Sequence, residues 1–324
     1  MARSPGTHQE WTTAQISDQR LRVAVVTGSN TGVGFEVAKA LAAHSATVVL
    51  ACRDPARGEA AVQRLREELA QPAGPGAEGP VDVRLQQLDL ASLRSVREAA
   101  DRICTEHPRL DLLINNAGVM WAPHGVTEDG FETHLGVNHL GHFALTGLLL
   151  PKLAATPGSR IVAISSPAHR RAMIDFDDLQ SEHDYRPQRA YGRSKLANLM
   201  FAYELDRRLR TAGLLTAALA AHPGGARSEL NRTMPWMFRG ENWGVARPIT
   251  QGVQRGALPI LRAATDSQAR GGQYYGPDGP FQFTGDPTLV ESTPRSHDEA
   301  QQRRLWEASE KLTDVTYEFS TLNL

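Results

Sequence analysis

The chain has 324 residues, 41% of them apolar, and its 35 basic and 36 acidic residues leave a formal net charge of −1 at pH 7. The apolar content suffices for a sizeable core, and the balanced charge excludes a general attraction to nucleic acid or to an anionic membrane surface. The two cysteines, Cys52 and Cys104, exclude a disulfide framework and a thiol-rich metal site.

Residues 1–20 form a polar N-terminal extension, which lacks the apolar run of a signal peptide. Farther along the chain, no stretch reaches the roughly 18 uninterrupted apolar residues that a membrane span needs. Together with the cysteine count, these features predict a reduced, cytoplasmic protein without a membrane span.

From Arg22 onward, short apolar segments alternate with longer segments of helical periodicity. The predicted strands are 22–28, 47–53, 83–90, 110–118, 159–166 and 214–225, and the predicted helices are 35–45, 56–70, 92–107, 131–154 and 190–213. Strands that are apolar throughout and alternate with helices are typical of a parallel sheet covered on both faces. Because no internal repeat or second domain boundary is found, residues 21–324 are predicted to form one α/β domain, a doubly wound parallel sheet with helices on both faces.

A glycine-rich loop, TGSNTGVG at 27–34, lies between the first predicted strand and the first predicted helix. Dinucleotide phosphates bind at this place in doubly wound sheets, because glycines let the backbone approach the pyrophosphate at a helix N-terminus. A plain turn is the alternative, and the strand–loop–helix context favours the cofactor site. The residues assigned to it are Gly28, Ser29, Asn30, Thr31, Gly32, Val33 and Gly34.

The end of the second predicted strand indicates which nicotinamide cofactor is used. A carboxylate at this position would bind the adenosine 2′-hydroxyl group, but Cys52 occupies the position and Arg53 follows it. The missing carboxylate removes repulsion from a 2′-phosphate, and Arg53 could pair with that phosphate. We therefore predict NADP(H) over NAD(H); an ordinary surface arginine is the alternative.

Tyr191 and Lys195 in AYGRSK (190–195) are separated by one helical turn, so their polar ends face the same side. A protonated lysine favours ionisation of a neighbouring phenol, which lowers the tyrosine pKa from about 10 toward a range useful for acid/base catalysis. The alternative is an incidental pair on a surface helix. The choice depends on whether a cofactor and a substrate meet at this pair.

Four motifs in order resemble the short-chain dehydrogenase/reductase family: the glycine loop, NNAG at 115–118, a strand ending in ISS, and Y-x-x-x-K. The resemblance covers about residues 22 to 230. GSNTGVG, ACRD, VNHLGHF and HPGGARSEL are most similar to the retinol-dehydrogenase branch and to related protochlorophyllide-reductase-like bacterial proteins. The resemblance implies a Rossmann fold and an NADP(H)-dependent oxidoreductase that interconverts a lipophilic alcohol and its aldehyde or ketone.

The resemblance also implies the catalytic residues. Tyr191 would be the general acid/base, and Lys195 would lower its pKa and bind the nicotinamide ribose. Ser166 would hold the substrate oxygen, and Asn138 would carry a water that links Lys195 to solvent. Asn115 would fix the central strands. The further cofactor contacts implied are Asp89, Leu90, Asn116, Ala117, Gly118, Pro223, Gly224 and Ser228.

The segment TMPWMF (233–238) follows the nicotinamide loop directly, where the family places its substrate lid. We interpret about 229–250 as a flexible apolar lid, with core packing as the alternative. The predicted substrate contacts are Met234, Trp236, Met237 and Phe238.

Three histidines, His134, His139 and His142, recur at helical spacing, which could bring two of them together. No acidic or thiol partner stands at zinc-ligand spacing, so no metal site is predicted.

Two other functions use the same scaffold. A reductase of a ring double bond, similar to protochlorophyllide reductase, is disfavoured because neither cysteine lies near Tyr191 or the substrate loop in the sequence. Sensors of this fold commonly lose the tyrosine or the lysine. This chain keeps both Tyr191 and Lys195, which disfavours a non-catalytic NADP-binding sensor. The expected partner is a small lipophilic carbonyl or alcohol, and the sequence leaves the oligomeric state open.

Overall fold

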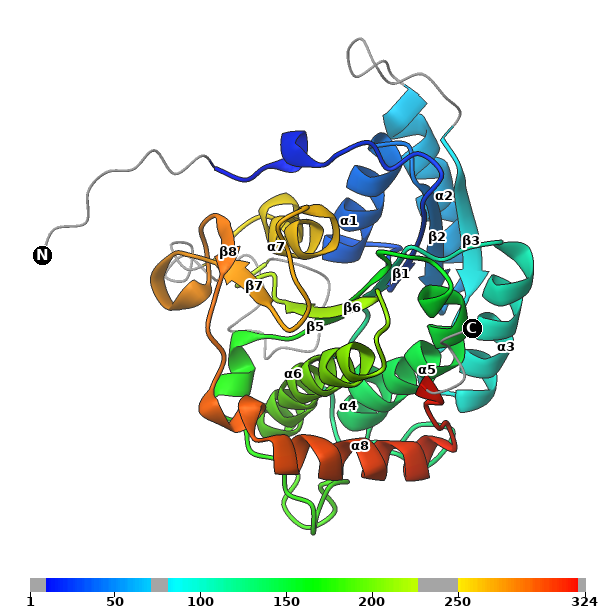
Figure 1. Cartoon of the computed structure of the whole chain (residues 1–324). Helices are drawn as coiled ribbons and strands as arrows, with labels where there is room; N and C mark the ends of the chain where they lie inside the picture. The colour runs from blue at the N-terminus through cyan, green and yellow to red at the C-terminus, as the bar shows by residue number, and fades with distance from the viewer. Residues whose placement is uncertain (1–9, 71–80, 227–249, 320–324) are drawn as a thin grey trace, which may run out of the picture.

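The computed structural model describes residues 10–70, 81–226 and 250–319 (Figure 1). Within them, one sheet has the strand order β3-β2-β1-β4-β5-β6-β7-β8. The strands are β1 Val23–Thr27, β2 Thr47–Cys52, β3 Val83–Gln87, β4 Leu112–Asn115, β5 Arg160–Ile164, β6 Ala217–Ala221, β7 Tyr274–Pro277 and β8 Pro287–Leu289. Neighbouring strands are parallel except β8, which pairs antiparallel with β7. The predicted doubly wound sheet is confirmed, with one antiparallel edge strand added.

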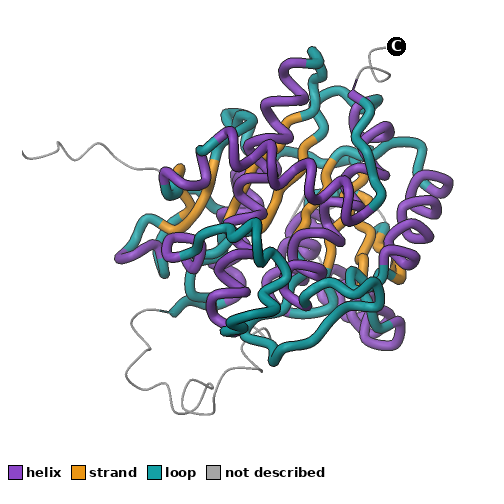
Figure 2. The backbone as a smooth tube through the Cα atoms, turned by 90° about the horizontal axis from the view of Figure 1, so that it is seen from below, coloured by secondary structure: helices purple, strands orange, loops and turns teal. Residues whose placement is uncertain are grey.

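Helices cover both faces of this sheet, as two views at right angles show (Figures 1 and 2). The helices are α1 Gly32–Ala43, α2 Pro55–Ala70, α3 Leu93–Glu106, α4 Thr133–Leu135, α5 Gly141–Ala154, α6 Pro187–Thr211, α7 Val253–Thr265 and α8 Glu299–Thr313. α1, α2 and α7 pack on one face and α3, α5 and α6 on the other, while α8 lies against α5 and α6.

The apolar strand runs follow from this layering. In β1, Ala24 and Val26 are buried in the cluster with α1 and α7, whereas Val23 and Val25 are buried in the cluster with α3, α5 and α6. Each of these β1 residues therefore packs against helices whichever face of the sheet it points to, so this strand shows no alternation of polar and apolar residues.

Four elements, α7, β7, β8 and α8, were not predicted from the sequence. β7 is the four-residue segment YYGP and β8 the three-residue segment PTL, and both contain proline. Strands this short have no measurable periodicity, and proline argues against a strand assignment from sequence.

The described part of the N-terminal extension contributes to the core. Trp11 and Ile16 are buried in the cluster with α1 and α7, and Gln19 is fully buried. Although the extension is mostly polar, Trp11 and Ile16 therefore attach it to the core. Across the described residues, no helix is both long enough and apolar enough to span a membrane.

Candidate active site

A cleft of about 1660 Å³ lies at the carboxyl ends of the parallel strands. It is lined by the loops that follow β1 to β6, and β1 and β4 lie side by side at its centre. The strand order reverses between these two strands, and this crevice is where ligands bind in open α/β sheets. The topology therefore brings most of the predicted site residues to one place.

The glycine loop forms one wall of this cleft. Gly28 and Gly32 have φ values of +64° and +63°, a backbone region that favours glycine. A Cβ on Gly28 would lie 2.8 Å from the Ala117 Cα atom, so this position also lacks room for a side chain. The loop residues that line the cleft are Gly28, Asn30, Thr31, Gly32, Val33 and Gly34. The groove left by the missing side chains fits a pyrophosphate at the start of α1.

Ser29 differs from its predicted neighbours. Its side chain is buried, donates a hydrogen bond from Oγ to the Val26 carbonyl at 2.8 Å, and does not line the cleft. The Cys52 Sγ atom lies 3.8 Å from the same Oγ, and burial raises the pKa of the Cys52 thiol. Both side chains therefore stabilise the base of the loop from inside the protein.

The edge of the cleft beside β2 is cationic. Arg53, exposed at the end of β2, lines the cleft together with Arg57 from the first turn of α2. Asp89 and Leu90 line it beyond β3. No carboxylate closes β2, because the buried Cys52 occupies that place. The donor set at this edge fits a 2′-phosphate, and Arg57 is a lining residue that the sequence analysis missed.

The segment after β4 is tied to β1 through one hydroxyl group. Thr27 Oγ1 accepts hydrogen bonds from the Asn116 and Ala117 backbone amides, both at 2.9 Å, and Asn116 Nδ2 donates to the Thr27 carbonyl at 2.8 Å. Thr27 Oγ1 also contacts His142 Nε2 at 2.9 Å, and burial lowers the pKa of His142 to about 3. The histidine is therefore neutral and accepts from the threonine. Asn116, Ala117 and Gly118 line the cleft.

Asn115 plays a different part from the predicted one. Its Nδ2 atom donates to Thr146 Oγ1 at 2.9 Å, so the side chain ties β4 to helix α5 rather than to a neighbouring strand.

The predicted helix 131–154 is interrupted by a turn of different geometry. A π-helical turn, Gly136–Leu140, separates α4 from α5 and contains Asn138. In the Asn138 side chain, Oδ1 accepts from the Val119 backbone amide at 2.7 Å. Its Nδ2 atom donates to the Val119 carbonyl at 3.0 Å and to Ser194 Oγ at 2.9 Å. Such turns insert an extra residue and are frequent at functional sites. Asn138 is fully buried behind the cleft lining, where it joins the segment after β4 to α6.

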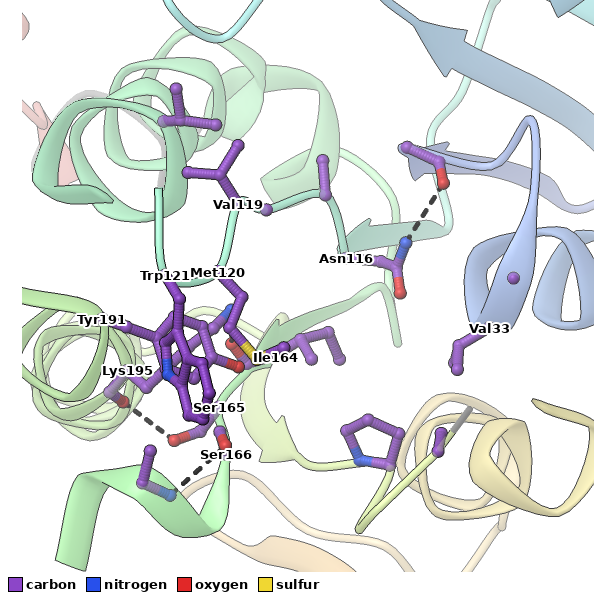
Figure 3. A pocket seen from close by; sticks show the side chains of 18 of the residues that line it. Val33, Asn116, Val119, Met120, Trp121, Ile164, Ser165, Ser166, Tyr191 and Lys195 are labelled. Atoms are coloured by element: carbon purple, nitrogen blue, oxygen red, sulfur yellow. Dashed lines mark hydrogen bonds between the residues drawn. The ribbon is translucent and has the colours of Figure 1, made fainter. Parts of the chain in front are cut away.

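Ser166, Tyr191 and Lys195 converge in the cleft (Figure 3). Ser166 follows β5, and the other two residues lie on α6, where both side chains are buried. Lys195 Nζ donates to the Ile164 carbonyl at 3.1 Å and lies 5.8 Å from the centre of the Tyr191 ring. Tyr191 and Lys195 therefore lie on one side of α6, as the Y-x-x-x-K spacing predicts, and both line the cleft.

Burial determines the electrostatics of this group. It lowers the pKa of Lys195 from 10.5 to about 8, and it raises the pKa of Tyr191, which a hydrogen bond to Ser166 opposes in part. The expected depression of the phenol pKa is therefore wrong for the protein alone. Desolvation of the buried phenol is the main cause, and the lysine amine donates to the Ile164 carbonyl rather than to the phenol. Tyr191 is consequently held as a proton donor.

The other end of the cleft has apolar walls that the sequence analysis did not identify. Met120 and Trp121 come from the segment after β4, Met173 follows Ser166 by seven positions, and Phe281 and Phe283 precede β8. Trp121 and Phe281 have φ values of +53° and +54°, which are unusual for aromatic residues. Trp121 lies three residues after the NNAG motif, and this position was a usable sequence signal for the wall. Residues 281–283 carry no such signal.

Buried polar groups hold the segment that carries Trp121. The Ala122 amide donates to His134 Nε2 at 3.2 Å, and the Tyr185 hydroxyl donates to the Ala122 carbonyl at 2.7 Å. Glu132 Oε1 lies 2.8 Å from His134 Nδ1, so the histidine donates there and accepts from Ala122. Both backbone groups of Ala122 are thus fixed by side chains.

The other two histidines of the 134–142 region also have partners that are not metals. His139 Nε2 pairs with Ser309 Oγ at 2.9 Å on α8, and His142 Nδ1 donates to the Asn138 carbonyl at 3.0 Å. Over residues 10–70, 81–226 and 250–319, no group of three potential metal ligands is found.

The remaining predicted contacts divide in two. Pro223 and Gly224, after β6, line the cleft. The other predicted contacts lie outside the described residues: Ser228, Met234, Trp236, Met237 and Phe238. The predicted lid at about 229–250 also lies outside them, except for Thr250.

Comparison with known proteins finds one family model and similar retinol dehydrogenases. The family model described as short chain dehydrogenase matches residues 22–236. Retinol dehydrogenase 14 of Mus musculus is 40% identical over 302 residues, covering 91% of this chain and 86% of that protein. Retinol dehydrogenase 12 of Homo sapiens is 39% identical over 299 residues, covering 92% of this chain and 88% of that protein.

Solved structures are similar as well. An uncharacterised protein from Mycobacterium paratuberculosis is 38% identical with a TM-score of 0.77, covering 95% of this chain and 99% of that one. RhlG of Pseudomonas aeruginosa, solved as a complex with NADP, is 24% identical with a TM-score of 0.63, covering 81% and 97%. The second likeness concerns the fold alone.

Proposed function

The chain belongs to the short-chain dehydrogenase family, in its retinol-dehydrogenase-like branch, and on this premise we propose that it is an NADP(H)-dependent oxidoreductase interconverting a lipophilic alcohol and its aldehyde or ketone. The observation that carries the proposal is the convergence of Ser166, Tyr191 and Lys195 in a cleft whose far wall is the glycine loop. A cytoplasmic location is part of the same proposal.

In the direction of reduction, a carbonyl compound, NADPH and a proton yield an alcohol and NADP⁺. When bound, the nicotinamide supplies the hydride or, in oxidation, accepts it. The Tyr191 hydroxyl gives its proton to the carbonyl oxygen, and the Ser166 hydroxyl donates a hydrogen bond to that oxygen. The raised pKa of Tyr191 keeps this proton available at neutral pH. The buried Lys195 amine, with its pKa near 8, is mainly protonated there and stabilises the negative charge left on the phenol.

Two features support NADP(H) and an apolar substrate. Arg53 and Arg57 flank the edge of the cleft where β2 ends, and the strand carries no carboxylate there. Trp121, Met173 and Phe281 provide apolar surface in the cleft that Ser166 also lines. Apolar substrate surface buried against such walls contributes roughly 25 cal/mol per Å².

The test is a series of straight-chain aldehydes assayed by loss of NADPH absorbance. We expect kcat/KM to rise a few-fold for each added methylene, within the limit of about 0.8 kcal/mol per group. Tyr191→Phe should lower turnover at least 100-fold and leave NADPH affinity close to wild type, because the phenol proton is not needed for cofactor binding. The matched control is Tyr203→Phe, whose hydroxyl pairs with Ser292 away from the cleft lining.

Two results would overturn the proposal. One is turnover of Tyr191→Phe above about a tenth of wild type, and the other is a flat or falling dependence on chain length. A light-dependent absorbance change with protochlorophyllide would favour the ring reductase instead. Neither Cys52 nor Cys104 lines the cleft, which argues against a thiol-dependent pigment site.

A further inference from the structure

The charge of the cleft lining is strongly one-sided. Among the described residues that line it, Asp89 is the single acidic side chain, and it lies beyond β3. The basic residues that line it are Arg53, Arg57, Arg170, Arg171, Arg189, Arg193 and Lys195. Arg53 and Arg57 are accounted for by a cofactor phosphate. The four arginines from 170 to 193 border the end of the cleft proposed for the substrate. A neutral lipophilic substrate has no charged group to pair with them.

Two of these four arginines have acidic partners. Arg189 Nη1 lies 2.8 Å from an Asp184 oxygen, and Arg193 Nη2 lies 3.7 Å from an Asp175 oxygen. Arg193 also donates to Ser181 Oγ at 3.0 Å. Their charges are largely compensated by the segment that precedes α6.

Arg170 and Arg171 are not compensated in this way. Arg170 Nη1 donates to the Phe281 carbonyl at 3.0 Å, which leaves its charge without an acidic partner in the described residues. Arg171 is exposed and has neither a hydrogen bond nor an ion pair from its side chain to any described residue. Two adjacent positive charges therefore face the cleft without a counter-charge from this part of the chain.

The location of the two arginines relates them to the reacting group. Both belong to the short 3-10 turn Pro167–Arg171, which begins directly after Ser166. At about 2.0 Å of rise per residue, they lie about 8–10 Å along the turn from the Ser166 backbone. Met173 and Phe281 flank the two arginines and are 60% and 76% exposed, so apolar and cationic surfaces adjoin here.

We propose that the substrate is an amphiphilic carbonyl compound whose apolar body carries a carboxylate, and that Arg171, with Arg170 beside it, binds this carboxylate. The inference rests on the proposed function and narrows its substrate class. A guanidinium group matches a carboxylate through two parallel N–H···O bonds. The apolar walls hold the body between the carboxylate and the carbonyl group that Tyr191 protonates.

The experiment compares an ω-oxo fatty acid with its methyl ester, which has the same chain and aldehyde but no charge. Both are assayed with NADPH as monomers below their aggregation concentration. We expect wild type to prefer the acid, mainly through a lower KM. Arg171→Gln should lower the acid-to-ester ratio of kcat/KM about fivefold, and Arg171→Glu should bring it below one. The preference should also weaken as salt is added.

The control is Arg303→Gln, which removes one positive charge on α8, where Arg303 pairs with Glu299 at 3.2 Å outside the cleft lining. Its acid-to-ester ratio should equal that of wild type. NADPH affinity, measured by fluorescence titration, reports whether each variant is folded with an intact cofactor site.

Several outcomes would overturn the inference. These are equal kcat/KM for acid and ester in wild type, an equal fall for both substrates in the Arg171 variants, or the same change of ratio in Arg303→Gln. A change of ratio that occurs only with anionic lipid vesicles would assign the arginines to a membrane surface instead. If neither compound is reduced while NADPH binds, the proposed function itself fails, which is a distinguishable result.

Discussion

The two ends of the cleft are built in different ways. The proposed cofactor end, which contains the glycine loop, consists of backbone and short side chains at the ends of neighbouring parallel strands, tied by Thr27 and Asn116. The proposed substrate end is assembled from side chains far apart in the sequence, such as Trp121 and Phe281, both with positive φ. A site formed at strand ends is defined by local sequence, whereas a site formed from distant segments depends on the polar contacts that hold each segment in place.

This difference predicts that substitutions at one end change NADPH affinity and those at the other change substrate KM. Lys195 lies where the two ends meet and should show the largest effect. Burial lowers its pKa to about 8, so below this pH the folded protein contains a buried charge. Lys195→Met should abolish turnover and stabilise the cofactor-free protein by on the order of 3 kcal/mol near pH 7.

The pH dependence of that stabilisation provides the check. Between about pH 8 and 10.5 the unfolded chain binds more protons at Lys195 than the folded protein, so wild-type stability gains with rising pH from this group. The difference in free energy of unfolding between Lys195→Met and wild type should therefore be largest near neutral pH and shrink toward pH 10, as measured by urea denaturation. A difference that is constant over this range would contradict the assignment of the buried charge.

The next largest effect is expected at the cofactor end, for Gly28→Ala. The added Cβ meets Ala117 at 2.8 Å in a backbone conformation with φ +64°, so the loop must move. NADPH affinity should fall at least tenfold, as measured by fluorescence titration. Gly213→Ala is the matched control: its φ is +70°, but nothing lies within 4 Å of the added Cβ. It should lose stability alone, and equal losses of NADPH affinity in both variants would contradict a direct role of the loop.

A comparable test at the cofactor end concerns the phosphate contact. Arg53→Ala should weaken NADPH binding roughly tenfold and leave NADH binding unchanged, because the exposed guanidinium loses one charged contact partly screened by water. Titrating both cofactors against the same variant separates the charge effect from a folding defect, which would weaken the two equally.

The smallest effect is expected at the substrate end, for Tyr185→Phe. The change removes the 2.7 Å hydrogen bond to the Ala122 carbonyl and frees the segment that carries Trp121. KM for a long-chain aldehyde should rise about fivefold, consistent with the loss of one net hydrogen bond, while kcat and NADPH affinity change little. Tyr203→Phe again serves as control. A fall in kcat without a change in KM would show that Tyr185 does not position the substrate wall.

Much of the cofactor end was predictable from sequence. The glycine loop, the NNAG motif and the Y-x-x-x-K pair are contiguous patterns, and the spacing of residues within a turn or a helix is fixed by backbone geometry. Ser29 was the exception: its place in the loop suggested a cofactor contact, but its side chain bonds the Val26 carbonyl. The direction in which a single loop side chain points depends on what lies beneath it.

The alternation of apolar strands and helices by itself determined the doubly wound sheet, because a strand buried on both faces needs apolar residues at every position. Only the tertiary structure decided the π-helical turn at Asn138, which depends on Val119 and Ser194 across the fold. It also decided the raised pKa of Tyr191, since desolvation depends on everything packed around the phenol. The meeting of Arg170 with Phe281, 111 residues apart, was decided in the same way: no local spacing records which distant segments share a cleft.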